Sequence, residues 1–180
     1  MPVQNNISFG SQLKPTRTLK QGFNLLRNNQ YHHPYDYHNF ANSVEAILND
    51  GSDDVIEITK NNTKGILMAK VNGKIILTER DYADNAYGKG KIFIGFLTSL
   101  ANQRNPKVDI LELSDYEREE VIKPIVRDLV NLTFNKQNNN SNSLLYEYLD
   151  VAENIKNKIC EANFKKIFET LEPKIFNDNI

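Results

Sequence analysis

All three histidines of the chain lie in one short stretch, QYHHPYDYHNF, which covers residues 30–40. Neutral imidazole is a common ligand of zinc and other transition metals, and the candidate ligands here are His32, His33, Asp36 and His38. Their spacing argues against a metal site. Adjacent residues of an extended chain point to opposite sides, and no histidine pair has the i, i+4 spacing of H-E-x-x-H. The sequence therefore predicts neither a metal nor a cofactor.

The same stretch opens a helix. Asp36 precedes an amphipathic pattern and is placed to cap it, which would occupy the carboxylate with backbone N–H groups. His38 would then lie in the first turn, on the face opposite the apolar stripe, and is expected to face solvent.

A second candidate for chemistry is AYGKGK, residues 86–91, within a predicted loop over residues 81–91. Two glycines among lysines can form a backbone nest for an anion, so Gly88, Lys89, Gly90 and Lys91 are candidate anion-binding residues. The alternative is a surface turn in which the glycines serve only the backbone. The pattern matches neither a P-loop nor a dinucleotide-binding fingerprint.

Composition limits the classes of function. The 180 residues have a net charge of −1, so no global field gathers nucleic acid. The single cysteine, Cys160, excludes an intramolecular disulfide and suits a reducing compartment. No apolar run approaches the roughly 20 residues that cross a bilayer. We therefore expect a cytoplasmic protein. Its 25 asparagines favour turns and caps and carry no catalytic weight.

Residues 1–35 contain four basic residues and no acid, whereas residues 36–180 carry 18 basic and 23 acidic residues. The sequence predicts a flexible basic arm over residues 1–35 and a single globular domain over residues 36–180. Apolar side chains dotted along the arm could anchor it to a protein partner: Phe9, Leu13, Leu19, Phe23 and Leu26. Plain disorder and an export signal are the alternatives.

The elements that must position any site follow an α+β pattern. An apolar stripe predicts a helix over residues 37–49, and β-branched runs predict strands over 54–60, 65–71 and 74–80. Asn72-Gly73 predicts a two-residue hairpin loop, in which Ala69 would face Ile76 and Met68 would face Leu77. Both faces of this sheet read as largely apolar, which predicts cover on both sides.

The second half of the chain is predicted to be mainly helical. We expect a helix over residues 92–104, where the continuous apolar run also fits a buried strand. A fourth strand is expected over 107–113, and a capping box at Ser114 opens a further helix. A long helix starts near Ser143, and its apolar stripe shifts phase near Asn163, which predicts a bend. The expected fold is an N-terminal helix, an antiparallel meander of three to four strands, and C-terminal helices packed on the sheet.

No residue pattern in the chain matches a catalytic motif. We therefore expect a non-enzymatic protein-interaction or regulatory module that uses the basic arm. A small hydrolase or transferase with a site near the 81–91 loop and His38 is the alternative, because active sites assemble from distant positions. The third possibility is an exported effector with an unfolded N-terminal signal.

Overall fold

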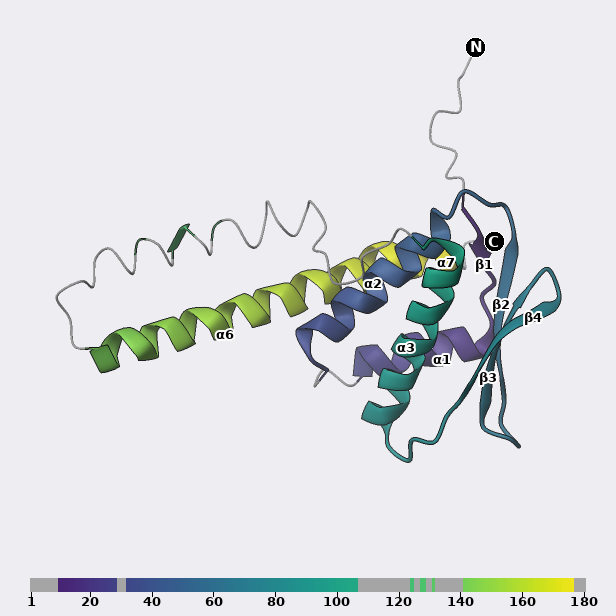
Figure 1. The fold of residues 1–180 in the computed structure, drawn as a ribbon, viewed down its shortest axis with the longest axis horizontal. Helices are drawn as coiled ribbons and strands as arrows, with labels where there is room; N and C mark the ends of the chain where they lie inside the picture. Colours follow the sequence, from purple (N-terminus) through teal and green to yellow (C-terminus); the bar gives the residue numbers. More distant parts are fainter. Residues whose placement is uncertain are drawn as a thin grey trace, which may run out of the picture.

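Figure 1 shows a computed structural model of the chain, which describes residues 10–28, 32–106, 124, 127–128, 131 and 141–176. The described strands are β1 (Gln12–Leu13), β2 (Val55–Asn61), β3 (Ile66–Val71) and β4 (Lys74–Arg80). The described helices are α1 (Arg17–Asn28), α2 (Pro34–Leu48), α3 (Ala86–Arg104), α6 (Ser141–Lys165) and α7 (Glu172–Ile175), with the π-helical turn η2 (Lys166–Leu171) between the last two. The predicted α+β class is confirmed.

The sheet has the strand order β1-β2-β3-β4. β2, β3 and β4 form the predicted antiparallel meander, and β1 adds a short parallel strand beside β2. Asn72 and Gly73 both have positive φ, at 50° and 89°, as a type I′ hairpin requires. The predicted register is wrong by one residue, because a bulge after Ala69 pairs it with Leu77 and not with Ile76.

The described helices lie on one side of the sheet, which corrects the expectation of cover on both faces (Figure 1). The buried face presents side chains such as Ile58 and Ala69, whereas Glu57, Thr59 and Lys70 alternate with them and lie on the other face. The outer face therefore carries several polar residues, and none of the described helices covers it.

α2 is the centre of the helical layer and contacts α3, α6 and η2, so the C-terminal helices pack on α2. Aromatic rings join these elements: the Phe23 ring lies 5.0 Å from Phe40 and 5.3 Å from Phe176. Arg27 of α1 also pairs with Glu172 of α7. The first and last described helices are therefore neighbours in space.

The expectation of a flexible arm is wrong for residues 10–28. These residues form β1 and α1, and the side chains of Leu13, Leu19, Phe23 and Leu26 are buried in the core. Leucine and phenylalanine at this helical spacing make an apolar stripe that packs inward, which outweighs the polar composition of the segment. Residues 1–9, with Phe9 among them, lie outside the described part of the chain.

Arg104, at the end of α3, links the N-terminal segment 10–28 to the turn before β2 through hydrogen bonds and ion pairs. Its guanidinium lies 2.9 Å from Asp50 and 2.6 Å from Asp54, and it donates hydrogen bonds to the hydroxyls of Ser11 and Ser52. Burial opposes the ionisation of Asp50, but hydrogen bonds from Ser11, Arg104 and Ser52 hold its pKa below the usual range. The hydrogen bond from Arg104 lowers the pKa of Asp54 to about 2.

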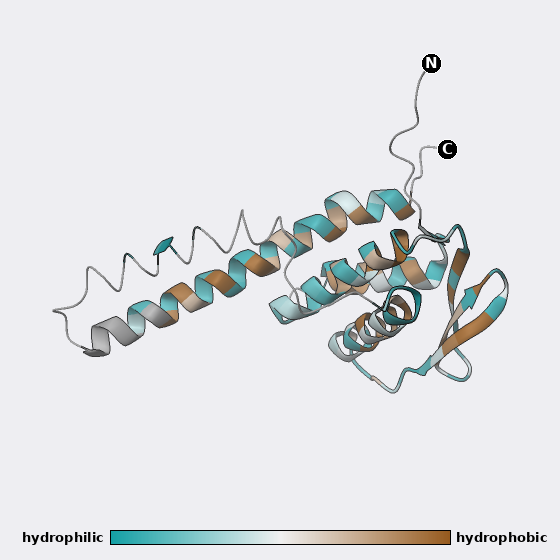
Figure 2. Ribbon diagram, turned by 45° about the horizontal axis from the view of Figure 1, so that its top comes forward, coloured by the Kyte–Doolittle hydropathy of each residue, from teal (hydrophilic) through white to brown (hydrophobic). Residues whose placement is uncertain are grey.

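α6 is an amphipathic helix of 25 residues, along which hydrophobic and hydrophilic segments alternate (Figure 2). The phase shift predicted near Asn163 is present slightly later, as η2, since a π-helical turn adds one residue to the helix repeat. Pro173 follows within α7, where its ring would crowd the carbonyl four residues earlier in a regular helix. The predicted strand over 107–113 and the start of the helix from Ser114 lie outside the described residues.

Candidate functional site

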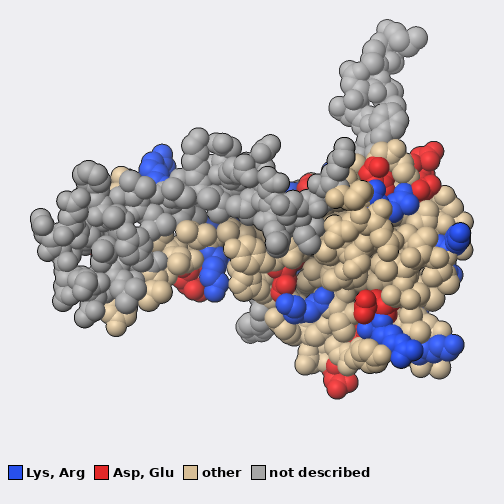
Figure 3. Space-filling model, in the orientation of Figure 1, with Lys and Arg blue, Asp and Glu red and all other residues tan. Residues whose placement is uncertain are grey.

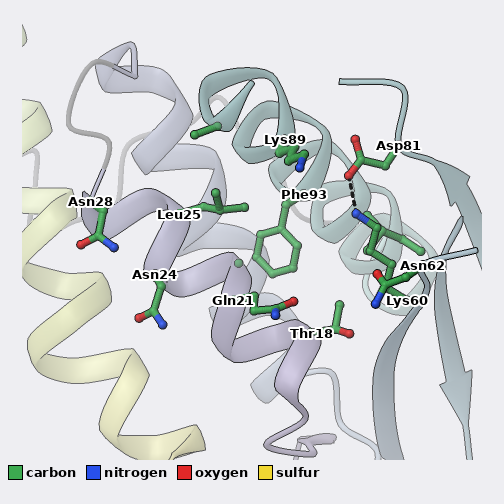
Figure 4. A pocket seen from close by; sticks show the side chains of 13 residues that line it. Thr18, Gln21, Asn24, Leu25, Asn28, Lys60, Asn62, Asp81, Lys89 and Phe93 are labelled. Atoms are coloured by element: carbon green, nitrogen blue, oxygen red, sulfur yellow. Dashed lines mark hydrogen bonds and ion pairs between the residues drawn. The ribbon is translucent and has the colours of Figure 1, made fainter. Parts of the chain in front are cut away.

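A cavity of about 760 Å³ opens between α1, α3 and the end of the sheet (Figure 4). Its size falls within the range of small-ligand and peptide sites. Four of its lining side chains are primary amides, and we call it the amide groove. The lining residues are Thr18, Gln21, Gly22, Asn24, Leu25, Asn28, Lys60, Asn62, Leu67, Asp81, Ala86, Lys89 and Phe93.

One wall of the amide groove is α1. Thr18, Gln21, Leu25 and Asn28 recur every three or four residues, so the helix presents them on one face, beside the buried stripe. Figure 4 shows them in sequence along α1. The side-chain oxygen Oδ1 of Asn24 accepts a hydrogen bond of 2.7 Å from Arg27. This bond orients the side-chain amide and leaves its NH₂ group as a donor.

The floor of the groove is the ring of Phe93 on α3, packed against Gly22 of α1. A Cβ added at Gly22 would lie 2.2 Å from that ring, so only glycine allows the two helices to approach this closely. Leu25 of α1 lies beside the Phe93 ring, which is only 3% exposed (Figure 4). The groove therefore combines an apolar floor with polar walls.

The sheet end of the groove carries an ion pair. Lys60 Nζ lies 2.8 Å from Asp81 Oδ2, and the other oxygen of Asp81 accepts a hydrogen bond from the N–H of Ala83. The Asp81 side chain is only 6% exposed, so the pair is largely withdrawn from water. Lys89 reaches the groove from α3 and makes no ion pair with any described residue.

The predicted loop over residues 81–91 ends at Asn85, because α3 begins at Ala86. The Asn85 side chain accepts a hydrogen bond of 2.7 Å from the N–H of Gly88, which is an N-cap interaction. The predicted anion-binding residues Gly88, Lys89, Gly90 and Lys91 are therefore the first turns of a helix. The two lysine side chains diverge: Lys91 lies 3.4 Å from Asp36, and among the four residues only Lys89 lines the groove.

His32 is buried between aromatic rings. Its ring stacks on Tyr87 at 4.7 Å and meets the edge of Tyr37, and a Cβ at Gly90 would lie 2.7 Å from Nε2. Nδ1 lies 3.5 Å from Asp36, too far for a good hydrogen bond. Burial therefore lowers the pKa of His32, and the nearby carboxylate of Asp36 opposes that shift only in part.

The other two histidines differ from expectation. His33, and not Asp36, is the N-cap of α2: its Nδ1 accepts from the N–H of Tyr35, and Asp36 accepts from the N–H of His33 in return. Pro34 is then the first helical residue. His38 is buried, where solvent exposure was predicted, and it pairs with the Asn42 amide at 3.0 Å.

A smaller cavity of about 570 Å³ lies over α6 and includes Tyr37, Cys160 and Phe164 in its lining. Burial raises the pKa of the Cys160 thiol and raises the pKa of Tyr37 to about 12, so both groups keep their protons near neutral pH. Within the described part of the chain, no group of three histidine, cysteine or acidic side chains could hold a metal ion.

The amide groove was missed by the sequence analysis, although Lys89 was a candidate. Asn and Gln at helical spacing next to an apolar stripe were the available signal, but the chain is rich in asparagine throughout. The predicted docking residues Leu13, Leu19, Phe23 and Leu26 lie in the core and line neither cavity.

Charges on the face seen in Figure 3 are mixed, and lysine or arginine side chains stand next to acidic ones. None of the described helices combines the length and hydropathy of a membrane span. Comparison of the chain with protein-family models, with curated proteins and with solved structures finds no match to any of them. The geometry of the molecule is therefore the basis for assigning a function.

Proposed function

We propose that this protein is a non-enzymatic protein-interaction module that binds an extended segment of a partner protein in the amide groove. The observation that carries the proposal is the row of polar side chains along one face of α1, which lines a cavity of about 760 Å³. The residues predicted to dock on a partner, namely Leu13, Leu19, Phe23 and Leu26, are buried in the core. The amide groove is instead open to a partner.

The dimensions of the row suit an extended chain. From Thr18 to Asn28, α1 advances about 15 Å at the usual rise per residue. An extended peptide covers that distance in about four or five residues. A segment of this length has several N–H and C=O groups that need hydrogen-bond partners when they leave water.

Primary amides are suited to supply those partners. Each of Gln21, Asn24, Asn28 and Asn62 has a carbonyl acceptor, an NH₂ donor or both, the same pair of functions that a peptide group offers. The amides recognise the backbone of a segment, and specificity comes from pockets for its side chains.

The test uses random heptapeptides displayed on phage and selected on the purified protein. We expect enriched peptides whose binding, measured by fluorescence anisotropy, is lost in Gln21→Trp, because the indole fills the groove. Asn154→Trp places the same side chain on the exposed part of α6 and should leave binding unchanged. Selection of no peptide above the level of Gln21→Trp would contradict the proposal.

A small enzyme is the second candidate, and the ion pair in the groove favours it. Asp81 and Lys89 come from the predicted 81–91 segment, and the pair of Lys60 with Asp81 offers a base and an acid in a sheltered place. His38 does not line this cavity. Hydrolysis of an ester or amide panel by the wild type, abolished in Lys60→Met with peptide binding retained, would favour the enzyme.

A further inference from the structure

We infer that Asn72 is a site of spontaneous deamidation and that Asp54 restrains this modification. Asn72 and Gly73 form the one Asn-Gly pair of the sequence, in the turn between β3 and β4. Neither residue lines the amide groove, so the modification is independent of the proposed function. The contacts of the Asn72 amide and the charge of Asp54 decide how fast it proceeds.

Deamidation uses only the asparagine side chain and the next backbone nitrogen. The nitrogen of Gly73 loses its proton, attacks Cγ of Asn72 and closes a cyclic imide, while the side-chain nitrogen takes up a proton and leaves as ammonia. Water then adds to one of the two ring carbonyls and breaks its bond to nitrogen, which gives aspartate or isoaspartate. The net reaction consumes water and releases ammonia, without an oxidant or a reductant. Asparagine is a thermolabile residue for this reason.

The turn gives the reacting nitrogen the space that ring closure needs. Asn72 and Gly73 are exposed, and no atom lies within 4 Å of the position that a Cβ would take on Gly73. Glycine is also the least hindered residue that can follow an asparagine, because it has no side chain. Among the described residues, the N–H of Gly73 has no hydrogen-bond partner, so hydroxide can remove its proton. The described part of the fold therefore leaves the nucleophile open.

The leaving group, in contrast, is held by Asp54. Nδ2 of Asn72 donates a hydrogen bond of 2.9 Å to Oδ1 of Asp54, and this bond must break before ammonia departs. Oδ1 of Asn72 accepts a hydrogen bond of 3.0 Å from the N–H of Val55. Attack on Cγ puts negative charge on this oxygen, which the N–H of Val55 stabilises and the carboxylate of Asp54 destabilises. Replacement of Asp54 therefore removes both effects that slow the reaction.

Asp50-Gly51 provides a comparison within the same chain. This pair can close the same imide with loss of water, and Gly51 likewise has no atom near its missing Cβ. The Asp50 side chain, however, is only 1% exposed, and its oxygens accept hydrogen bonds from Ser11 and Arg104. These bonds also hold the pKa of Asp50 below the usual range. An ionised and enclosed carboxylate is a poor target for a nucleophile, so we expect Asp50 to stay intact.

The product changes the contact between the turn and β2. A carboxylate at position 72 replaces the amide that Asp54 binds, and the pKa of Asp54, about 2, keeps that side chain ionised near neutral pH. Two like charges then meet at the distance of a hydrogen bond. Asp54 also pairs with Arg104 at 2.6 Å, so the repulsion acts on the link between residues 10–28 and β2. In isoaspartate the main chain also gains a carbon atom within the two-residue turn, which alters its geometry.

The experiment incubates the full chain at mildly alkaline pH and maps its peptides by mass spectrometry. We expect deamidation at Asn72 to be faster than at Asn49 and Asn85, which are followed by residues with side chains. Asp54→Ala should accelerate the reaction at Asn72 about fivefold, the factor that corresponds to one exposed hydrogen bond. Asp53→Ala removes the adjacent carboxylate, which is exposed, and should leave the rate unchanged.

A second variant separates the effect of Asp54 on the amide from a general loosening of the turn. Arg104→Met breaks the ion pair between Arg104 and Asp54 but keeps the hydrogen bond from Asn72 to Asp54. It should deamidate more slowly than Asp54→Ala, with the folded state of both variants checked by circular dichroism. Equal rates in the two variants would overturn the role assigned to Asp54.

Asn72→Asp reproduces one product and should have a lower urea midpoint than the wild type. Thr63→Asp adds the same charge to the exposed turn between β2 and β3 and should unfold near the wild-type midpoint. Equal midpoints for the two variants would overturn the effect assigned to the product. Deamidation at Asn72 no faster than at Asn49 and Asn85 would overturn the inference itself, as would an unchanged rate in Asp54→Ala.

Discussion

His32 is a neutral imidazole held between aromatic rings, next to a carboxylate that it does not reach well. Protonation would place a charge in a buried site, and Lys91, which lies 3.4 Å from Asp36, already compensates that carboxylate. The pKa of His32 is therefore lowered in the folded state, mainly by burial.

This shift makes stability depend on pH. The folded-state pKa lies below the unfolded value of 6.5, so below that pH the unfolded chain binds more protons. The contribution of His32 is complete above about pH 6.5 and is lost as the pH falls toward the folded-state pKa. We expect urea midpoints to fall from pH 7 to pH 5 in the wild type and to fall less in His32→Gln.

His33→Asn is the matched control, since asparagine keeps an N-cap acceptor at the start of α2. This variant should retain the wild-type dependence on pH. If His32→Gln retains it as well, another group titrates in this range and the role assigned to His32 is wrong.

The properties of single residues could be predicted from the sequence only where they depend on local conformation. Asparagine and glycine readily adopt the positive φ angles that a type I′ turn requires, so the hairpin at Asn72-Gly73 was predictable. The burial of His38 was not, because it depends on which helices pack beside α2. Lys89 was named for a glycine-rich loop that does not exist, and it reaches the groove for a different reason, its place on the face of α3.

Among the elements, the contact of α1 with α3 decides whether the amide groove exists. The helices meet at Gly22, where the Phe93 ring occupies the space that any side chain would need. Gly95 lies in the same helix as Phe93 but has no atom near its missing Cβ and is exposed. The two glycines therefore offer a matched pair.

We expect Gly22→Ala to lower the free energy of unfolding by about 1–3 kcal/mol, because the added methyl overpacks the contact with Phe93. Gly95→Ala should raise it by about 0.5–1 kcal/mol through helix propensity alone. Chemical denaturation at pH 7 measures both. Equal stabilisation by the two substitutions would show that α1 and α3 are not in close contact.

The elements that periodicity could reveal were predicted well, with the long apolar stripes of α2 and α6 as the best examples. The groove could not be predicted, since its walls come from residues 18–28, 60–62 and 81–93, and only tertiary packing brings them together. The bulge after Ala69 was not predicted either, because no residue pattern in the hairpin marks it.

For the whole molecule, residues 10–28 belong to the folded unit. Leu13, Leu19, Phe23 and Leu26 are buried, and each such burial contributes about 1.5–3 kcal/mol. Their sum is comparable with the total stability of an ordinary domain, about 5–15 kcal/mol.

Deletion of residues 1–28 should therefore abolish cooperative thermal unfolding, measured by circular dichroism. Deletion of residues 1–9 is the control, because it keeps β1, α1 and the Arg104 network, and it should retain a cooperative transition. A cooperative transition in the longer deletion, at the wild-type temperature, would restore the view of residues 1–35 as an independent arm.

The contact of α1 with α7 has a consequence for synthesis on the ribosome. Phe23 and Arg27 need Phe176 and Glu172, which are translated almost 150 residues later. At about 5–20 residues per second, roughly 8–30 s pass before the last neighbours of the apolar face of α1 are synthesised. The packing of α1 is therefore completed late in synthesis, and until then its leucine and phenylalanine side chains lack their last neighbours.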